Sequence, residues 1–505
     1  MFLFSILFLK TNFRFLRSST KPIFMIKQLI IAVLFLPILT NAQINVRDLG
    51  ARGNGSADDS YIIQKAIDSA IKSGKSVIIP KGRYKIEKPL VVSNWDGKDY
   101  KAVFIKIIGE STMWDMGDMS VIQASFKDAP ALSIQKGKGC IISGIFFQGA
   151  YQVPKISLSD LYRSTLEEYG DRTCRDSRYS PYCAIAIDPF SSTLPPDGGY
   201  PSLKKFYRGS GSRGGSTGIR IEDCSFDKFT IGAITSPNGS TQNAELITFQ
   251  NIRIGSCKIG IAGCQDQEKL NRVINLGAWG TTHTVFAFNK YGAARPGHWT
   301  IDGVNIAGEV VQIVYRVSHG WFPLFMKNIY AESVLRIGHW QSAVGDCLSE
   351  FVIDFRYPED IGFLPDNHLS GGGVALKNGS LRYYGKNYPI ILLGSERDYS
   401  VQDVEVSTTL GVKPAFLSTR VQNAIKNKES IIIQDVTVNK QGNSVEIQRP
   451  HPKAIVGKMV VFLNASNSNF VGTGVIESIS KSGFKIKWAS PIVTDKARYR
   501  ISIID

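Results

Sequence analysis

Two hydrophobic patterns follow one another along the chain. Between Asp58 or Asp59 and Gly74, apolar residues recur at helical spacing, at Ile62, Ile63, Ala66, Ile67, Ala70 and Ile71. This predicts one amphipathic helix, with an aspartate suited to its N-terminus and a glycine suited to its C-terminus. From SVIIPKGRYKI (76–86) onward the apolar residues alternate instead, which predicts short strands.

The strands belong to a repeat. From residue 218 an apolar strand ends in Asn, Asp or Gly, and a second strand follows at once. The turn residues are Asp223, Asn251, Asn275, Gly303, Asn328, Asp354, Asn378 and Asp403, at spacings of 24 to 28 residues, with an earlier copy at Gly144. These residue types tolerate left-handed backbone at a sharp bend. Three short strands in each repeat fit one coil of a parallel β-helix, whereas a propeller blade needs about 40 residues.

Stacked turn asparagines in such a solenoid are expected to hydrogen-bond from coil to coil. The open N-terminal end of a solenoid exposes apolar core and unpaired strand edge, so it needs a cap. We therefore expect an all-β, right-handed parallel β-helix whose first coil is plugged by the apolar face of the helix.

The N-terminal 42 residues read as a separate segment. From Met25, a basic Lys27 precedes an apolar stretch at 29–39, and Thr40-Asn41-Ala42 offers a small-residue cleavage site before Gln43. This pattern is typical of a secretory signal peptide, with translation expected to start at Met25. A membrane anchor is the alternative, but the apolar stretch is short for a span. We expect a secreted, extracellular or periplasmic protein with no membrane span in its mature chain.

Two further boundaries are expected. The β-helix is assigned to 43–411, with an inserted region at about 148–217 that is rich in Tyr, Gly, Ser and Pro. The turn pattern stops near residue 410. Strong alternation with Gly turns then predicts a small β module or cap over 412–505.

The N-terminal stretch carries a recognisable motif, formed by Val46, Asp48, Gly50, Ala51, Gly53, Gly55, Asp58, Asp59, Pro80, Gly82 and Tyr84. It resembles the signature of the pectate lyase superfamily, in its rhamnogalacturonase/epimerase-like branch. The resemblance implies a right-handed parallel β-helix and covers polysaccharide lyases, glycoside hydrolases, epimerases and tailspikes. The catalytic signatures of these enzymes are mostly missing, and Ser318-His319-Gly320 matches a Gly-His-Gly motif only in part.

Charge and cysteine content narrow the partners. The net charge of +16 favours an acidic partner, here an acidic polysaccharide, and no basic block with interleaved aromatics indicates nucleic acid. Among the seven cysteines, Cys174 and Cys183 could close a short loop, while Cys224 and Cys257 fall in strands and are expected to be buried. No spacing indicates zinc. Calcium assists some lyases of the resembling family, but no calcium loop is seen and no cofactor is expected. The oligomeric state stays open.

In enzymes that the chain resembles, substrate crosses the first sheet of each coil. The repeat places that sheet at TIGAI, KIGIA, TVFAF, VQIVYR and VLRIG. Gln312, Arg316 and Arg336 are expected to point out of it toward a groove. Four histidines lie nearby, and His298, His319 and His339 stand beside tryptophans, which suits stacking on sugars but also packing at coil corners. The expected substrate-binding residues are Gln265, Gln267, Lys269, Tyr291, Gln312, His319, His339 and Trp340.

Three functions remain open at this point. A hydrolase needs two carboxylates, for which Asp266 and Glu268 are the candidates. A lyase needs a base and positive charge beside a uronate carboxylate, for which Lys290, Arg316 and Arg336 are the candidates. A non-catalytic, adhesin-like glycan-binding protein is the third possibility, and it would not need carboxylates or bases that converge in one groove.

Overall fold

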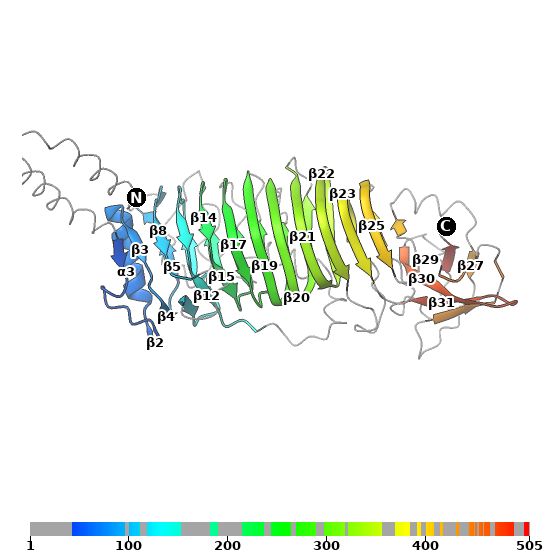
Figure 1. Ribbon diagram of the computed structural model, residues 1–505, viewed down its shortest axis with the longest axis horizontal. Helices are drawn as coiled ribbons and strands as arrows, with labels where there is room; N and C mark the ends of the chain where they lie inside the picture. Colours follow the sequence, from blue (N-terminus) through cyan, green and yellow to red (C-terminus); the bar gives the residue numbers. More distant parts are fainter. Residues whose placement is uncertain are drawn as a thin grey trace, which may run out of the picture. The chain divides into compact units, whose positions relative to one another are not determined.

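The computed structural model of the protein describes residues 43–95, 100–111, 119–152, 182–189, 215–236, 244–263, 269–288, 297–318, 322–355, 369–383, 391–394, 400–408, 415–417, 431–433, 444–448, 450–451, 454–457, 459–464, 470–488 and 499–503. Its dominant feature is a stack of coils, in which each coil adds strands that pair in parallel with those of the coil before it (Figure 1). Hydrogen bonds join these strands into one network of 24 strands.

The first coils contain short elements. They are β1 (Gln43–Asn45), β2 (Asn54–Asp58), α3 (Ser60–Ser73), β3 (Ser76–Ile78), β4 (Gly82–Ile86), β5 (Leu90–Val92), the antiparallel pair β6 (Asn94–Trp95) and β7 (Tyr100–Lys101), then β8 (Lys106–Ile108), β9 (Ser120–Ala124), β10 (Leu132–Ile134), β11 (Ile141–Ser143), β12 (Phe146–Gln148), β13 (Cys183–Ile187), β14 (Arg220–Glu222), β15 (Ser225–Asp227), β16 (Ile231–Thr235), β17 (Thr248–Ile254) and β18 (Ile259–Gly263).

The later coils contain longer strands, because pairing continues through the turns. They are β19 (Asn271–Phe288), β20 (Trp299–Ser318), β21 (Leu324–Val334), β22 (Arg336–Phe355), β23 (Leu369–Tyr383), β24 (Ile391–Gly394), β25 (Ser400–Thr408) and β26 (Ala415–Leu417). Parallel pairing thus runs to β26, slightly past the expected end of the β-helix.

Each coil contributes to three sheets, which we number in the order predicted from the sequence. Sheet 1 runs in register through Leu90, Leu132, Ile185, Ala233, Ile261, Phe286, Val314, Gly338, Leu369, Leu392 and Phe416. Sheets 2 and 3 precede and follow the left-handed turn of each coil. The five segments expected to form sheet 1 do so, and the predicted parallel β-helix is confirmed.

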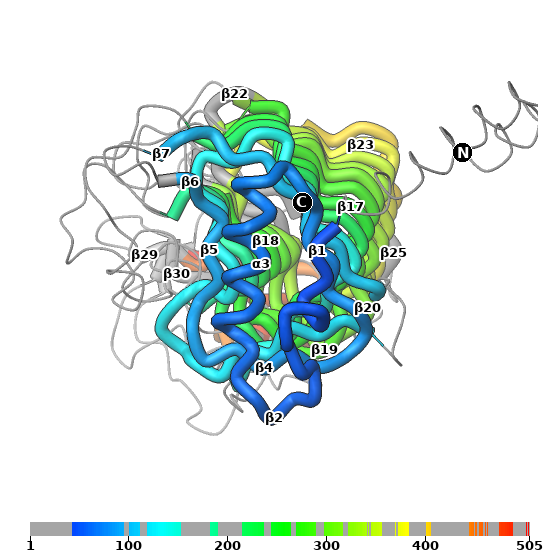
Figure 2. Tube along the Cα trace, turned by 90° about the vertical axis from the view of Figure 1, so that its left-hand side faces the viewer, coloured from blue at the N-terminus to red at the C-terminus, as the bar shows by residue number. Residues whose placement is uncertain are grey.

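The helix α3 lies across the N-terminal end of the coils (Figure 2). It contacts β3 and β5, and Ile63, Ala66, Ile67 and Ala70 are its buried apolar residues. The helix ends at Gly74, which is left-handed with φ 69° as predicted. Asp59 occupies the N-cap position, but its carboxylate accepts hydrogen bonds from the backbone of Arg52 and Gly53 at 2.8 and 2.9 Å instead of capping the helix. The predicted cap of the solenoid is therefore present.

The turn between sheets 2 and 3 is a row of left-handed residues. Asp223, Asn251, Asn275, Asn328, Asn378 and Asp403 have φ values of 50 to 57°, and glycines hold the equivalent place at 144 and 303. The expected side-chain ladder is present, since Asn251 donates to Asp223 at 2.9 Å and Asn275 donates to Asn251 at 2.8 Å. One assignment is wrong. Glu350, with φ 53°, takes the turn position that the repeat assigned to Asp354, and Asp354 lies on sheet 3 beside Arg382.

The C-terminal segment has a different architecture. Six strands form an antiparallel sheet in the order β27-β32-β29-β30-β31-β28, namely β27 (Ile431–Ile433), β28 (Ser444–Ile447), β29 (Met459–Asn464), β30 (Phe470–Ile479), β31 (Phe484–Trp488) and β32 (Tyr499–Ile503). It has its own core, which includes Val460, Phe462, Ile476, Ile486 and Ile501. The small β module predicted here is confirmed.

Candidate functional site

Sheet 1 contains two rows of residues, each formed by in-register positions on successive strands. In both rows the residues change from apolar to polar along the β-helix. In its earlier coils Cys183, Ala186, Ile231, Ile234, Ile259, Ala262 and Ala287 pack as one hydrophobic cluster. The row of Cys183, Ile231 and Ile259 continues in register to Thr284, Gln312 and Arg336. The row of Ala186, Ile234, Ala262 and Ala287 continues to Tyr315 and His339. Polar groups thus replace apolar ones in the coils of β19, β20 and β22.

We call the polar residues of the two rows, together with the adjacent Lys258 and His283, the sheet 1 polar cluster. Its full membership is Lys258, His283, Thr284, Gln312, Tyr315, Arg336 and His339. Gln312 is fully buried and Arg336 is 4% exposed. Buried polar groups are uncommon enough to require an explanation, and tuned groups of this kind concentrate at functional sites.

Thr284 is the hydrogen-bonding centre of the cluster. Gln312 Nε2 donates to Thr284 Oγ1 at 2.8 Å, and His283 Nδ1 lies 2.8 Å from the same oxygen. Gln312 Oε1 is buried without a hydrogen-bond partner among the residues that the structure describes. The rings of Tyr315 and His339 lie 5.5 Å apart between centroids, so the second row also makes direct contact.

The electrostatics of the cluster keep its buried histidine neutral. Burial, followed by the positive charges of Arg336 and Lys258, lowers the pKa of His283 well below its usual range. A neutral imidazole has a free ring nitrogen lone pair, so it can accept a hydrogen bond or a proton. No carboxylate belongs to the rows of sheet 1 described above, so the cluster lacks the acid pair of a hydrolase in the described residues.

Arg316 does not join this cluster, and its expected position on a groove is wrong. It is fully buried, and its Nε donates to Asp346 Oδ2 at 2.5 Å. Trp340 is also fully buried and donates to the same carboxylate oxygen at 2.6 Å, while the backbone N–H of Leu324 donates to Asp346 Oδ1 at 2.8 Å. Arg316 and Asp346 therefore satisfy each other's charge inside the coil, where they stabilise the fold and do not face a groove. The substrate-contacting role expected for Trp340 is likewise not supported.

The other expected site residues have mixed outcomes. Gln312 and Arg336 are buried rather than facing an open groove, but they do lie together. Lys269 lies elsewhere, 4.0 Å from Glu245 and above the ring of Phe322. The following lie outside the described residues: Gln265, Asp266, Gln267, Glu268, Lys290, Tyr291 and His319. Lys258, Thr284 and Tyr315 were not predicted, although the in-register rows that contain them mark their position.

Two side findings concern cysteines and metals. The loop that Cys174 and Cys183 could have closed is not supported, because Cys183 is a free thiol in the hydrophobic cluster; Cys174 lies outside the described residues. Cys224 and Cys257 are buried as expected. Within the described part of the chain, no group of three or more His, Cys, Asp or Glu side chains could hold a metal ion, and no helix is long and apolar enough to cross a bilayer.

Comparison with known proteins agrees with the fold. Residues 43–153 match the family described as "Rhamnogalacturonase A/epimerase, pectate lyase-like". These residues include the N-terminal motif, so the predicted resemblance is confirmed over this part of the chain, and the strand pairing beyond it continues the same parallel β-helix. No curated protein matches the chain.

The solved structures that match the chain are distant in sequence. DFA-IIIase from Arthrobacter chlorophenolicus A6 without its lid is 10% identical, over 73% of this chain and 90% of that one, with a TM-score of 0.48. Endo-xylogalacturonan hydrolase from Aspergillus tubingensis is 11% identical, over 75% and 98%, with a TM-score of 0.45. The Streptococcus pneumoniae surface protein and adhesin PfbA is 15% identical, over 74% and 99%, with a TM-score of 0.39.

Proposed function

We propose that the chain is a carbohydrate-active enzyme that cleaves an acidic polysaccharide by elimination, with the sheet 1 polar cluster as its site. The observation that carries this proposal is the geometry of His283, which hydrogen-bonds Thr284 at the point where an apolar row of sheet 1 changes to Thr284, Gln312 and Arg336. Burial and the charges of Arg336 and Lys258 lower the pKa of this histidine, so it is neutral. The pectate lyase-like family supports a polysaccharide substrate. The net charge supports an acidic one, since it is +16 for the full chain and still +11 for residues 43–505, because residues 1–42 hold five basic and no acidic residues.

The residues divide the work as follows. Arg336, assisted by Lys258, pairs with the uronate carboxylate and stabilises the negative charge that develops when the adjacent C5 proton leaves. Thr284 Oγ1 accepts from Gln312 and accepts from Nδ1–H of His283 in the tautomer that places the basic lone pair on Nε2. His283 Nε2 takes the proton, the C4–O bond breaks, a C4=C5 double bond forms, and the departing oxygen takes a proton from water. Because the cluster is buried, substrate must displace the groups that cover it.

The reaction type is tested with the purified protein and a panel of pectin, alginate and sulfated galactans. Reducing ends are measured together with the ultraviolet absorbance of a new carbon–carbon double bond. The proposal expects both signals to rise. Reducing ends alone would contradict it in favour of a hydrolase and direct attention to Asp266 and Glu268. Binding without either signal would contradict it in favour of an adhesin-like protein.

We also propose that the chain is secreted, since residues 25–42 have the order of basic, apolar and small residues found in signal peptides. N-terminal sequencing of the protein exported by its native host tests this. Export with an N-terminus at Gln43 is expected, and retention of the intact segment in the cell would contradict it.

A further inference from the structure

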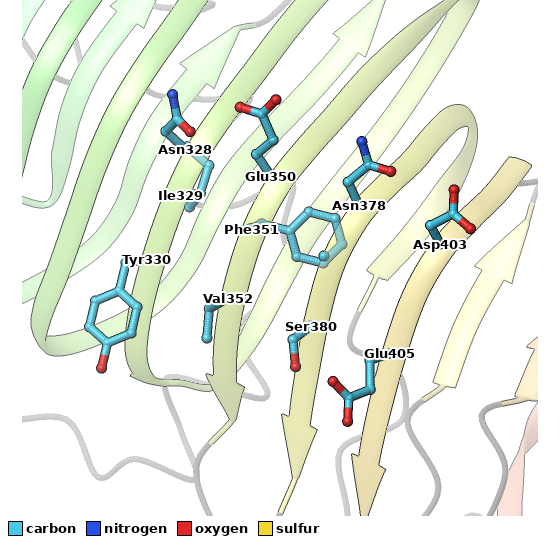
Figure 3. A pocket seen from close by; sticks show the side chains of 11 residues that line it. Asn328, Ile329, Tyr330, Glu350, Phe351, Val352, Asn378, Ser380, Asp403 and Glu405 are labelled. Atoms are coloured by element: carbon cyan, nitrogen blue, oxygen red, sulfur yellow. The ribbon is translucent and has the colours of Figure 1, made fainter.

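A hollow lies on sheet 3, away from the rows that form the sheet 1 polar cluster. It crosses β21, β22, β23 and β25 and has a volume of about 610 Å³. We call it the sheet 3 groove. Its lining residues are Asn328, Ile329, Tyr330, Glu350, Phe351, Val352, Asn378, Gly379, Ser380, Asp403 and Glu405 (Figure 3).

The groove exists because small side chains stand between large ones in one row. Tyr330, Val352, Ser380 and Glu405 are in register on four successive strands. Figure 3 shows Tyr330 and Glu405 at opposite ends of this row, with Val352 and Ser380 between them. Neighbouring strands are about 4.8 Å apart, so the two ends are about 14 Å apart. That length accommodates a short saccharide lying across the strands.

The walls of the groove carry the groups that recognise sugars. Tyr330 is 42% exposed, and the neighbouring carboxylate of Glu332 raises the pKa of its hydroxyl. An exposed aromatic face of this kind can pack against the C–H face of a sugar. The left-handed turn row supplies Asn328, Glu350, Asn378 and Asp403 along one rim. The amides can donate and accept hydrogen bonds, and the carboxylates accept them from hydroxyl groups.

Charge selects the kind of sugar. The lining contains three carboxylates, from Glu350, Asp403 and Glu405. The neighbouring Arg382 donates to Ser380 Oγ at 3.4 Å, but its charge is balanced by Asp354 at 3.8 Å, so the groove is acidic overall. Neither Glu350 nor Asp403 forms a side-chain hydrogen bond or ion pair with another residue that the structure describes. An anionic glycan would be repelled here, and these described carboxylates do not form a metal site.

We propose that the sheet 3 groove binds a short segment of a neutral saccharide, with Tyr330 against one sugar ring and Glu350, Asp403 and Glu405 accepting hydrogen bonds from sugar hydroxyls. The proposal is independent of the reaction at sheet 1. It assigns the two faces of the β-helix to glycans of opposite character, an acidic one at the cationic cluster and a neutral one at the acidic groove.

The test is titration calorimetry of the full chain with cellohexaose, xylohexaose, mannohexaose and hexagalacturonate as probes. At least one neutral hexasaccharide is expected to bind. Tyr330→Ala should weaken that binding about tenfold through lost ring stacking. Ser380→Trp, which fills the middle of the row, should abolish it. Tyr61→Ala is the matched control, because Tyr61 is a 71% exposed tyrosine on α3, remote from this row.

Three results would overturn the proposal. They are failure of all three neutral probes to bind, neutral binding that survives both Tyr330→Ala and Ser380→Trp, and hexagalacturonate binding that these two variants weaken. Circular dichroism of each variant shows that a loss is local and does not reflect misfolding. Cleavage of an acidic polymer at sheet 1 has a separate readout, so either proposal can fail without the other.

Discussion

The sheet 1 polar cluster and the sheet 3 groove are built from overlapping coils but have opposite character. The cluster is mostly buried and contains Lys258 and Arg336, whereas the groove is an open hollow lined by three carboxylates. Strand β22 contributes to both, with Arg336 at its start and Glu350 farther along. One strand therefore presents a cation to sheet 1 and an anion to the region of sheet 3.

The difference shows how a solenoid acquires a site. Each row repeats the same environment in successive coils, so most rows repeat the same residue type. The cluster begins where Ile259 gives way to Thr284 and Gln312 in one row. The groove is bordered by Glu350, where the turn row otherwise contains Asn, Asp or Gly in these coils. In both regions the candidate site lies where the residue type at one position changes from coil to coil. Packing alone would be satisfied by the same residue type in every coil, so such a change indicates another role.

The largest predicted effect concerns the corner beside sheet 1. Asp346→Ala leaves the guanidinium of Arg316 buried without its carboxylate, which should lower the free energy of unfolding by about 3–5 kcal/mol. Asp354→Ala is the matched control on sheet 3, where the ion pair with Arg382 is 3.8 Å long and partly exposed. That change should cost at most about 1 kcal/mol. Urea denaturation measures both. Equal losses would contradict the distinction between the buried and the exposed pair.

The second prediction concerns cleavage at sheet 1. Arg336→Gln removes the proposed carboxylate partner and should lower kcat/KM on an acidic polysaccharide by about 100-fold or more. The control is Lys327→Gln, which removes an exposed cation paired with Asp302 at 2.9 Å on sheet 2. Both variants lose one positive charge, so long-range attraction falls equally. Similar rates for the two variants would mean that Arg336 contributes only net charge.

Much of the architecture could be predicted from local pattern. Helical spacing located α3, and the preference of Asn, Asp and Gly for left-handed backbone located most turns. Glu350 escaped because glutamate has no such preference, so the repeat assigned its position to Asp354, four residues later, on sheet 3. A repeat of residue types cannot identify a turn residue of a different type, and Glu350 at the rim of the sheet 3 groove is such a residue.

The candidate site was harder to predict, because it depends on long-range pairing. Arg316 and Arg336 look equivalent in sequence, since each is a cation within a predicted sheet 1 segment. Only the structure shows that Arg316 meets Asp346, 30 residues away, whereas Arg336 lies in register with Gln312. Cys183 likewise looked suited to a disulfide, but it is a free thiol packed in the hydrophobic cluster of sheet 1.

The third prediction is a pH effect confined to sheet 1. The pKa of His283 is lowered in the folded protein, so below about pH 6.5 the unfolded chain binds a proton that the native state does not. Stability therefore falls as the pH drops below that value, by up to about 1.4 kcal/mol per pH unit, and is unaffected above it. Thermal unfolding from pH 5 to 8 measures this. The difference between wild type and His283→Gln isolates the residue, and parallel curves for the two proteins would contradict it.

The smallest predicted effect lies in the turn row at the sheet 3 groove. Glu350 has a left-handed backbone, which a residue other than Gly or Asn adopts at a cost of about 1–2 kcal/mol. Glu350→Asn should restore the side-chain ladder between Asn328 and Asn378 and raise the free energy of unfolding by about 1 kcal/mol. The same change removes a groove carboxylate and should weaken neutral saccharide binding. Opposite signs for stability and binding would identify Glu350 as a residue kept for function, whereas a loss of stability would show that its backbone carries no strain.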